Sequence, residues 1–151
     1  MHVLLVTSNG GHLDQLTRLR PWWSQHDRTW VSFDTPDARS VLRDEPNVVI
    51  AYHPTTRNAV NALRNLRLAW RVLRDIRPDV VVSAGAGVAV PFFVLARLLG
   101  IATAYLEVYD RIDNATLTGR LVTPFADAVL LQWEQQRQLY PTGRLVGPVY
   151  E

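Results

Sequence analysis

The stretch Val80-Val81-Val82-Ser83-Ala84-Gly85-Ala86-Gly87 decides the fold class of this chain. A short run of β-branched residues, typical of a buried strand, leads directly into a loop of small residues. The apolar segment 88–99 that follows has the length of a helix, and residues 102–106 have the composition of a second buried strand. Strand, helix and strand in this order predict a parallel sheet with helices packed on it.

The same alternation extends from this stretch to both ends of the chain. Apolar periodicity predicts further strands at residues 3–6, 29–33, 48–51, 128–131 and 145–146, and helices at 12–20, 36–43, 58–76, 117–125 and 134–139. A length of 151 residues suits one domain with one core. We therefore predict an α/β fold over residues 1–151, a Rossmann-like parallel sheet with helices on both faces. Ligands of such sheets bind beyond the carboxyl ends of the strands.

Composition excludes several classes of function. The chain has no cysteine, so it can form neither disulfides nor thiolate metal sites, and no other metal-ligand spacing stands out; we expect no metal and no cofactor. A net charge of only +2 argues against nucleic acid as a partner. No secretory signal is visible, and the longest apolar stretch, residues 88–101, is interrupted by Pro91, Arg97 and Gly100. We expect a cytoplasmic location, with peripheral membrane contact open.

Two loops of small residues follow predicted strands and precede predicted helices. The first contains Asn9, Gly10 and Gly11, and the second contains Gly85 and Gly87. Glycine lets a ligand approach the backbone closely, and the free N–H groups of a helix N-terminus favour an anion. The glycines of the first loop could instead serve only to turn the chain. Two such loops at two strand ends favour a cleft for a phosphorylated ligand, whereas dinucleotide binding is disfavoured because neither loop has the third glycine of G-x-G-x-x-G.

Two residues near these loops are candidates for acid–base catalysis. His12 begins the helix after the first glycine loop, where a neutral imidazole could accept the proton of a sugar hydroxyl. Glu107 ends a predicted strand, where a carboxylate could act as a base or bind a hydroxyl. The structural alternatives are a histidine that only braces the loop and a glutamate that forms a local ion pair with Arg111.

The long helix predicted at residues 58–76 carries a basic stripe. Arg64, Arg67, Arg71 and Arg74 recur at intervals of three or four residues and therefore share one side of the helix. The predicted buried face consists of Ala62, Leu66, Ala69, Leu73 and Ile76. A solvated surface is the default interpretation of the stripe, and contact with anionic lipid headgroups is the functional one.

An ordered set of motifs resembles a known family of sugar transferases. The stretch around Gly85 and Gly87, the Gly10-Gly11-His12 loop and Glu107 resemble the acceptor half of MurG-type transferases. A closer resemblance is to PssD-type exopolysaccharide subunits. That family also includes the membrane-anchoring subunit of the split N-acetylglucosaminyl transferase of dolichol-linked oligosaccharide synthesis. Its further marks here are Leu117-Thr118-Gly119-Arg120, Ala126-Asp127 and Gln132-Trp133-Glu134.

The resemblance implies the N-terminal, acceptor half of a GT-B glycosyltransferase. It implies a polyprenyl-diphosphate-linked saccharide as acceptor, with the diphosphate near Asn9, Gly10, Gly11, Gly85 and Gly87, and His12 or Glu107 as base. Arg111, Thr118 and Arg120 would lie in a loop that faces the acceptor or a partner. The chain stops at Gly147-Pro148-Val149-Tyr150-Glu151, where the crossing into a donor domain is expected.

The implied activity is transfer from a UDP-sugar, with a separate donor-binding glycosyltransferase subunit as partner. The implied location is peripheral, on the inner face of the plasma membrane. A non-catalytic scaffold that recruits and activates a partner transferase is the alternative.

Overall fold

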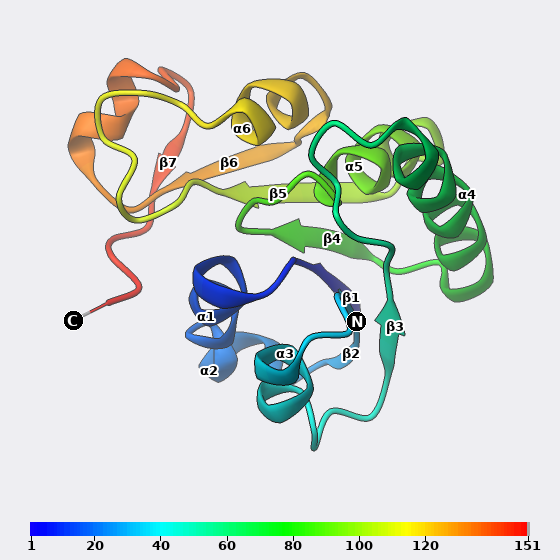
Figure 1. Cartoon of the computed structure of the whole chain (residues 1–151). Helices are drawn as coiled ribbons and strands as arrows, with labels where there is room; N and C mark the ends of the chain where they lie inside the picture. Colours follow the sequence, from blue (N-terminus) through cyan, green and yellow to red (C-terminus); the bar gives the residue numbers. More distant parts are fainter. Residues whose placement is uncertain (151) are drawn as a thin grey trace.

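The computed structural model describes residues 1–150, which form a seven-stranded sheet with every strand parallel to its neighbours. The strand order is β3-β2-β1-β4-β5-β6-β7 (Figure 1). The strands are β1 (His2–Val6), β2 (Asp27–Ser32), β3 (Val48–Ile50), β4 (Val80–Ser83), β5 (Ala102–Leu106), β6 (Ala128–Leu131) and β7 (Arg144–Leu145). The order reverses between β1 and β4, which is the position where ligands of doubly wound sheets bind.

Helices cover both faces of this sheet because the central strands are apolar on both sides. In β1, Val3 and Leu5 pack in one core with Leu13 and Leu16, whereas Leu4 and Val6 pack in the other core. The first face carries α1 (Gly10–Thr17), α2 (Arg20–Trp23) and α3 (Pro36–Val41), and the second carries α4 (Ala59–Ile76), α5 (Ala89–Leu98) and α6 (Leu117–Val122) (Figure 1). The 3₁₀ segments Thr123–Phe125 and Glu134–Gln138 flank β6.

The predicted element order is confirmed, with one element missed. The strands at residues 80–83, 102–106 and 128–131 have the predicted bounds. The single helix predicted at residues 12–20 is two helices, because α1 ends at Thr17 and the short α2 begins at Arg20. Pro21 lies in the first turn of α2, where its missing N–H costs no hydrogen bond.

The predicted buried face of α4 is wrong at its N-terminal half. Ala62 and Leu66 are exposed, and Asn61 and Asn65 are buried in their place. The physical reason is that backbone groups in the segment before the helix form hydrogen bonds with these two asparagine side chains. The Asn65 amide accepts from the Tyr52 N–H and donates to the Tyr52 carbonyl, both at 2.9 Å, and Asn61 Nδ2 donates to the Pro54 carbonyl.

We expect Asn65→Ala to lower the free energy of unfolding by about 2 kcal/mol, because it leaves two backbone groups of Tyr52 without partners. Urea denaturation measures this change. Asn47→Ala is the matched control, since its amide makes one exposed hydrogen bond, to the Arg28 carbonyl. An equal, small loss for both variants would contradict this role of Asn65.

Candidate functional site

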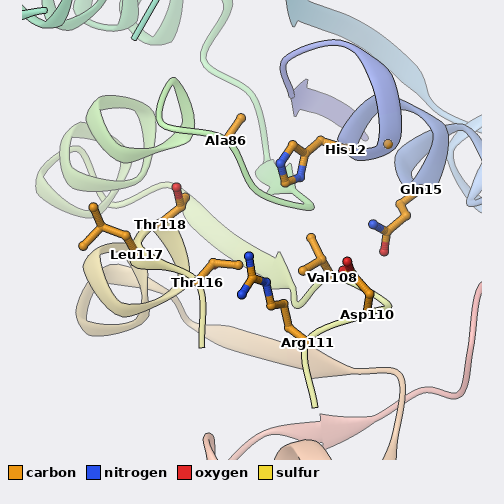
Figure 2. A pocket seen from close by; sticks show the side chains of 10 residues that line it. His12, Gln15, Ala86, Val108, Asp110, Arg111, Thr116, Leu117 and Thr118 are labelled. Carbon is orange, nitrogen blue, oxygen red and sulfur yellow. The ribbon is translucent and has the colours of Figure 1, made fainter. Parts of the chain in front are cut away.

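A cavity of about 340 Å³ lies beyond the carboxyl ends of β1, β4 and β5. Three segments that are distant in sequence meet there: the first turns of α1, the loop after β4, and the chain between β5 and α6. Figure 2 shows His12 and Arg111 extending into the cavity from opposite sides. The lining residues are Gly11, His12, Gln15, Ala86, Val108, Asp110, Arg111, Thr116, Leu117 and Thr118.

The His12 ring is oriented by the loop after β4. His12 Nδ1 lies 3.1 Å from the Ala84 carbonyl oxygen, which can only accept a hydrogen bond, so Nδ1 carries a proton. In the neutral ring this leaves Nε2 unprotonated and able to accept a proton. Gly85 lies directly beneath the ring, since a Cβ at this position would be 2.7 Å from His12 Nδ1. The backbone φ of +122° at Gly85 also requires glycine.

The first glycine loop lies only partly at the cavity. Gly11 lines the cavity, but the Gly10 N–H already donates to Asp37 Oδ2 at 2.9 Å, and Asn9 is exposed without capping α1. A carboxylate of the chain therefore occupies the amide at which an anion was expected. Any anion at this helix end would meet the N–H groups of the residues that follow Gly10 in the first turn.

In the second glycine loop, the two glycines lie against other loops of the same edge. Ser83 Oγ accepts from the Gly85 N–H at 3.1 Å and donates to the Gly85 carbonyl, which fixes a tight turn. A Cβ at Gly87 would lie 3.1 Å from Thr55 Oγ1, so the loop after β3 packs closely against this backbone. Ala86, between them, is the residue of this loop that lines the cavity.

Glu107 is not in the cavity. Its side chain has 0% exposure, and both carboxylate oxygens are engaged, with Oε1 accepting from the Val108 N–H and the Tyr105 hydroxyl and Oε2 from the Tyr140 hydroxyl. Burial raises the pKa of the Glu107 carboxyl above its ordinary value, against the lowering effect of the hydrogen bonds from Tyr140, Val108 and Tyr105. The carboxylate is therefore enclosed in this structure, and the predicted alternative of an ion pair with Arg111 is not found among residues 1–150.

The Glu107 cluster instead joins β5 to α6. The Tyr105 hydroxyl also hydrogen-bonds Thr116 Oγ1 at 3.1 Å, and Thr116 caps α6 by accepting from the Gly119 N–H. Burial and the neighbouring carboxylate raise the pKa values of Tyr105 and Tyr140, so both hydroxyls stay protonated donors. Through Tyr105, the Glu107 carboxylate is thereby linked to Thr116 at the wall of the cavity.

Three buried glutamines brace the loop that carries Arg111, and sequence analysis missed them. Gln15 Oε1 accepts from the Tyr109 N–H and from Gln132 Nε2, and Gln132 also donates to the Glu107 carbonyl. Gln136 Nε2 donates to the carbonyls of Val108 and Arg111. The only signal for this network was the Gln132-Trp133-Glu134 motif, which gave no indication of its partners; Trp133 Nε1 donates to the Tyr109 carbonyl.

Arg111 and Thr118 line the cavity, whereas Arg120 is exposed outside its wall. Within residues 1–150, no carboxylate lies close enough to Arg111 to form an ion pair. The guanidinium therefore faces His12 across the cavity with its donors available for a planar or tetrahedral anion.

The four arginines of α4 lie on the helix surface and outside this cavity. None of them forms an ion pair with another residue in the 1–150 segment. Exposed apolar side chains flank them, namely Val60, Leu63, Leu66 and Trp70. Among residues 1–150, no helix combines the length and hydropathy needed to cross a bilayer.

Comparisons with known proteins agree with this architecture. The family described as "Oligosaccharide biosynthesis protein Alg14 like" matches residues 24–149. The "UDP-N-acetylglucosamine transferase subunit ALG14" of Homo sapiens is 24% identical over 179 residues, covering 99% of this chain and 83% of the human protein. The "UDP-N-acetylglucosamine--N-acetylmuramyl-(pentapeptide) pyrophosphoryl-undecaprenol N-acetylglucosamine transferase" of Tolumonas auensis is 38% identical over 79 residues, covering 52% of this chain and 21% of that enzyme.

Among solved structures, MurG of Acinetobacter baumannii superimposes with a TM-score of 0.78 and 22% identity. The match covers 97% of this chain and 45% of MurG, so the chain spans less than half of that protein. The predicted Rossmann-like half of a GT-B fold is thereby confirmed. Because the family match extends over most of the sequence, the chain belongs to the Alg14-like family of oligosaccharide biosynthesis proteins.

Proposed function

We propose that the chain is the acceptor-binding subunit of a two-component UDP-sugar glycosyltransferase that acts on a polyprenyl-diphosphate-linked saccharide. The observation that carries this proposal is the juxtaposition of His12 and Arg111 across one cavity at the reversal of the strand order. The names of its relatives, a UDP-N-acetylglucosamine transferase subunit among them, support the reaction class. A partner subunit would supply the UDP-sugar site.

In the proposed reaction, His12 is the base. The acceptor hydroxyl oxygen attacks the anomeric carbon of the donor sugar, the bond from that carbon to UDP breaks, and UDP leaves with the bonding electrons. The hydroxyl proton passes to His12 Nε2, which is the free nitrogen because Nδ1 is bonded to the Ala84 carbonyl. Arg111 binds the acceptor diphosphate, together with the amides of the first turn of α1.

The experiment that tests the proposal compares the chain alone with the chain co-purified with a donor-binding subunit. Transfer from UDP-N-acetylglucosamine to a lipid-linked acceptor is measured by product formation, and UDP-sugar binding by calorimetry. We expect turnover only with both subunits. Tight UDP-sugar binding and turnover by the chain alone would contradict the division of labour.

We further propose that α4 holds the chain against an anionic membrane surface. Its unpaired arginines and the neighbouring exposed Leu63 and Trp70 suit a headgroup layer with aliphatic chains beneath it. The inner face of the plasma membrane stays a prediction.

Replacing Arg64, Arg67, Arg71 and Arg74 together by glutamine is expected to weaken binding to anionic vesicles about a thousandfold, at about 1 kcal/mol per arginine. Vesicle co-sedimentation at low and high salt measures the change. The control replaces Arg18, Arg39, Arg97 and Arg137, which are engaged in ion pairs elsewhere on the surface. An equal loss in both quadruple variants would mean that net charge, rather than α4, drives the binding.

A further inference from the structure

A second cavity of about 670 Å³ adjoins the first one and shares Leu117 and Thr118 with it. It lies between the loop that precedes α4, the start of α5 and the exposed side of α6. Its volume falls within the range of small-molecule sites. Its lining consists of Thr55, Thr56, Arg57, Ala62, Asn65, Gly87, Val90, Pro91, Leu117, Thr118 and Leu121.

The chemistry of this lining is divided between one cationic end and one apolar wall. Arg57 is its single charged side chain, with the Thr55 and Thr56 hydroxyls beside it in sequence, and no acidic residue lines it. Arg57 has no ion-pair partner in the part of the chain that the structure describes. Pro91 and Leu121 contribute to the apolar wall.

The loop that carries Arg57 is built into the fold. On the side of α4, Asn61 and Asn65 donate hydrogen bonds of 2.9 Å to the carbonyls of Pro54 and Tyr52. On the side of the loop after β4, Thr55 packs against Gly87, where a Cβ would lie 3.1 Å from Thr55 Oγ1. Two buried asparagines on a surface helix therefore hold the loop that contributes Thr55, Thr56 and Arg57 to the cavity lining.

We propose that this second cavity binds the phosphate-proximal end of a prenyl chain, with Arg57 as a phosphate ligand. A free sugar would leave the wall of Pro91 and Leu121 uncovered, and a nucleotide base would find no aromatic ring in the lining to stack on. An aliphatic phosphate matches both ends, because the guanidinium binds the anion and the wall covers the chain.

The position of the cavity gives the ligand a direction. Leu117 is 73% exposed and Leu121 is 47% exposed, so the apolar wall continues onto the outer surface of α6. A prenyl chain can leave the cavity past Leu121, while Thr118 borders both this cavity and the cavity of His12 and Arg111. The inference rests on the proposed function and adds to it a lipid subsite and a second cationic ligand.

The experiment measures binding of geranyl phosphate to the full chain in solution by calorimetry, with geraniol and inorganic phosphate as separate ligands. We expect saturable binding of geranyl phosphate, at least tenfold weaker binding by Arg57→Gln, and weaker binding by Leu121→Asn. Arg43→Gln is the matched control, since Arg43 is an exposed arginine outside the cavity lining, and it should bind as the wild type does. Urea denaturation confirms that each variant is folded.

Three outcomes would overturn the inference: unchanged affinity in both Arg57→Gln and Leu121→Asn; an equal loss in Arg43→Gln, which would indicate a general effect of net charge; or inorganic phosphate binding as tightly as geranyl phosphate. The test needs no donor and no turnover. If transfer fails while geranyl phosphate binds as expected, the proposed function falls and the lipid site stands. If transfer succeeds and geranyl phosphate does not bind, the proposed function stands and the lipid site falls.

Discussion

His12→Gln is expected to lower the rate of sugar transfer by the assembled transferase roughly 10²–10⁴-fold, the usual contribution of a general base. The acceptor KM should change little, because the phosphate ligands remain. Glutamine can keep a hydrogen bond to the Ala84 carbonyl through its amide, so the loop after β4 retains a partner. The lost function is then the proton acceptor at Nε2. Steady-state transfer assays with the lipid-linked acceptor give both constants.

His2→Gln is the matched control for this substitution. The His2 ring hydrogen-bonds Thr29 Oγ1 at 2.9 Å and lies at the start of β1, whereas the cavity lies beyond that strand's other end. A histidine change there should leave the transfer rate unaltered. Full activity of His12→Gln in the assembled complex would show that catalysis lies in the partner and that this chain acts as a scaffold.

Gly85→Ala tests the same proton transfer by displacing the His12 ring instead of replacing it. The added Cβ would lie 2.7 Å from His12 Nδ1, and φ of +122° is strained for any side chain. The ring must therefore move, and we expect a loss of rate close to that of His12→Gln with His12 still present. Gly100→Ala is the comparison, since it has a positive φ of +72° but no atom within 4 Å of the added Cβ. It separates backbone strain from displacement of the ring.

The parts of the fold that the sequence predicts are those whose hydrophobic pattern is local. Residues 80–83 and 102–106 are short apolar runs next to turn residues, and their strand bounds are as predicted. The buried face of α4 does not follow this rule, because Asn65 is buried by its bonds to Tyr52, a partner that precedes the helix. Hydrophobic periodicity identifies apolar positions only. It cannot predict that a polar residue is buried because its side chain hydrogen-bonds the backbone of another segment.

For the candidate site, the sequence likewise predicts the location but not the orientation of individual side chains. Its location beyond the carboxyl ends of β1 and β4 follows from two glycine loops that each succeed a strand. The direction of a single side chain at a strand end does not follow, and Glu107 points into the protein because Tyr140, 33 positions later, supplies a buried donor. The bond from Gln132 to Gln15 joins residues 117 positions apart, so no local pattern could reveal the brace behind Arg111.

Glu107→Ala is expected to lower the free energy of unfolding by about 3 kcal/mol or more, because it opens a void and leaves two buried donors, the Val108 N–H and the Tyr140 hydroxyl, without an acceptor. Glu107→Gln has nearly the same shape. Its amide oxygen can accept from the Val108 N–H and the Tyr105 hydroxyl, and its NH₂ can donate to Tyr140 once that hydroxyl turns to accept. We therefore expect the glutamine variant to retain most of the transfer rate and the alanine variant to lose both stability and activity.

The pH dependence of stability gives this prediction a second measurement. Burial raises the pKa of Glu107 above the value of 4.5 expected in the unfolded chain, so the folded state holds this proton more tightly. The contribution to stability is complete below pH 4.5 and is lost as the pH rises through the raised folded value. Glutamine has no such proton, so the unfolding free energy of Glu107→Gln relative to wild type should increase with pH from 4.5 upward. Urea denaturation across this window measures the difference, and the other carboxyl groups cancel because both proteins carry them.

These two measurements separate a positioning role from a chemical one. A residue that braces α6 through Tyr105 and Thr116 can be replaced by a neutral residue of equal shape, provided that the hydrogen bonds persist. A general base cannot, because an amide does not accept the proton of a hydroxyl at catalytic rates. If Glu107→Gln is as stable as the wild type and yet transfers sugar hundreds of times more slowly, the carboxylate takes part in the reaction. In that case the α6 segment must move on acceptor binding to bring Glu107 into the cavity, since in this structure it is fully enclosed.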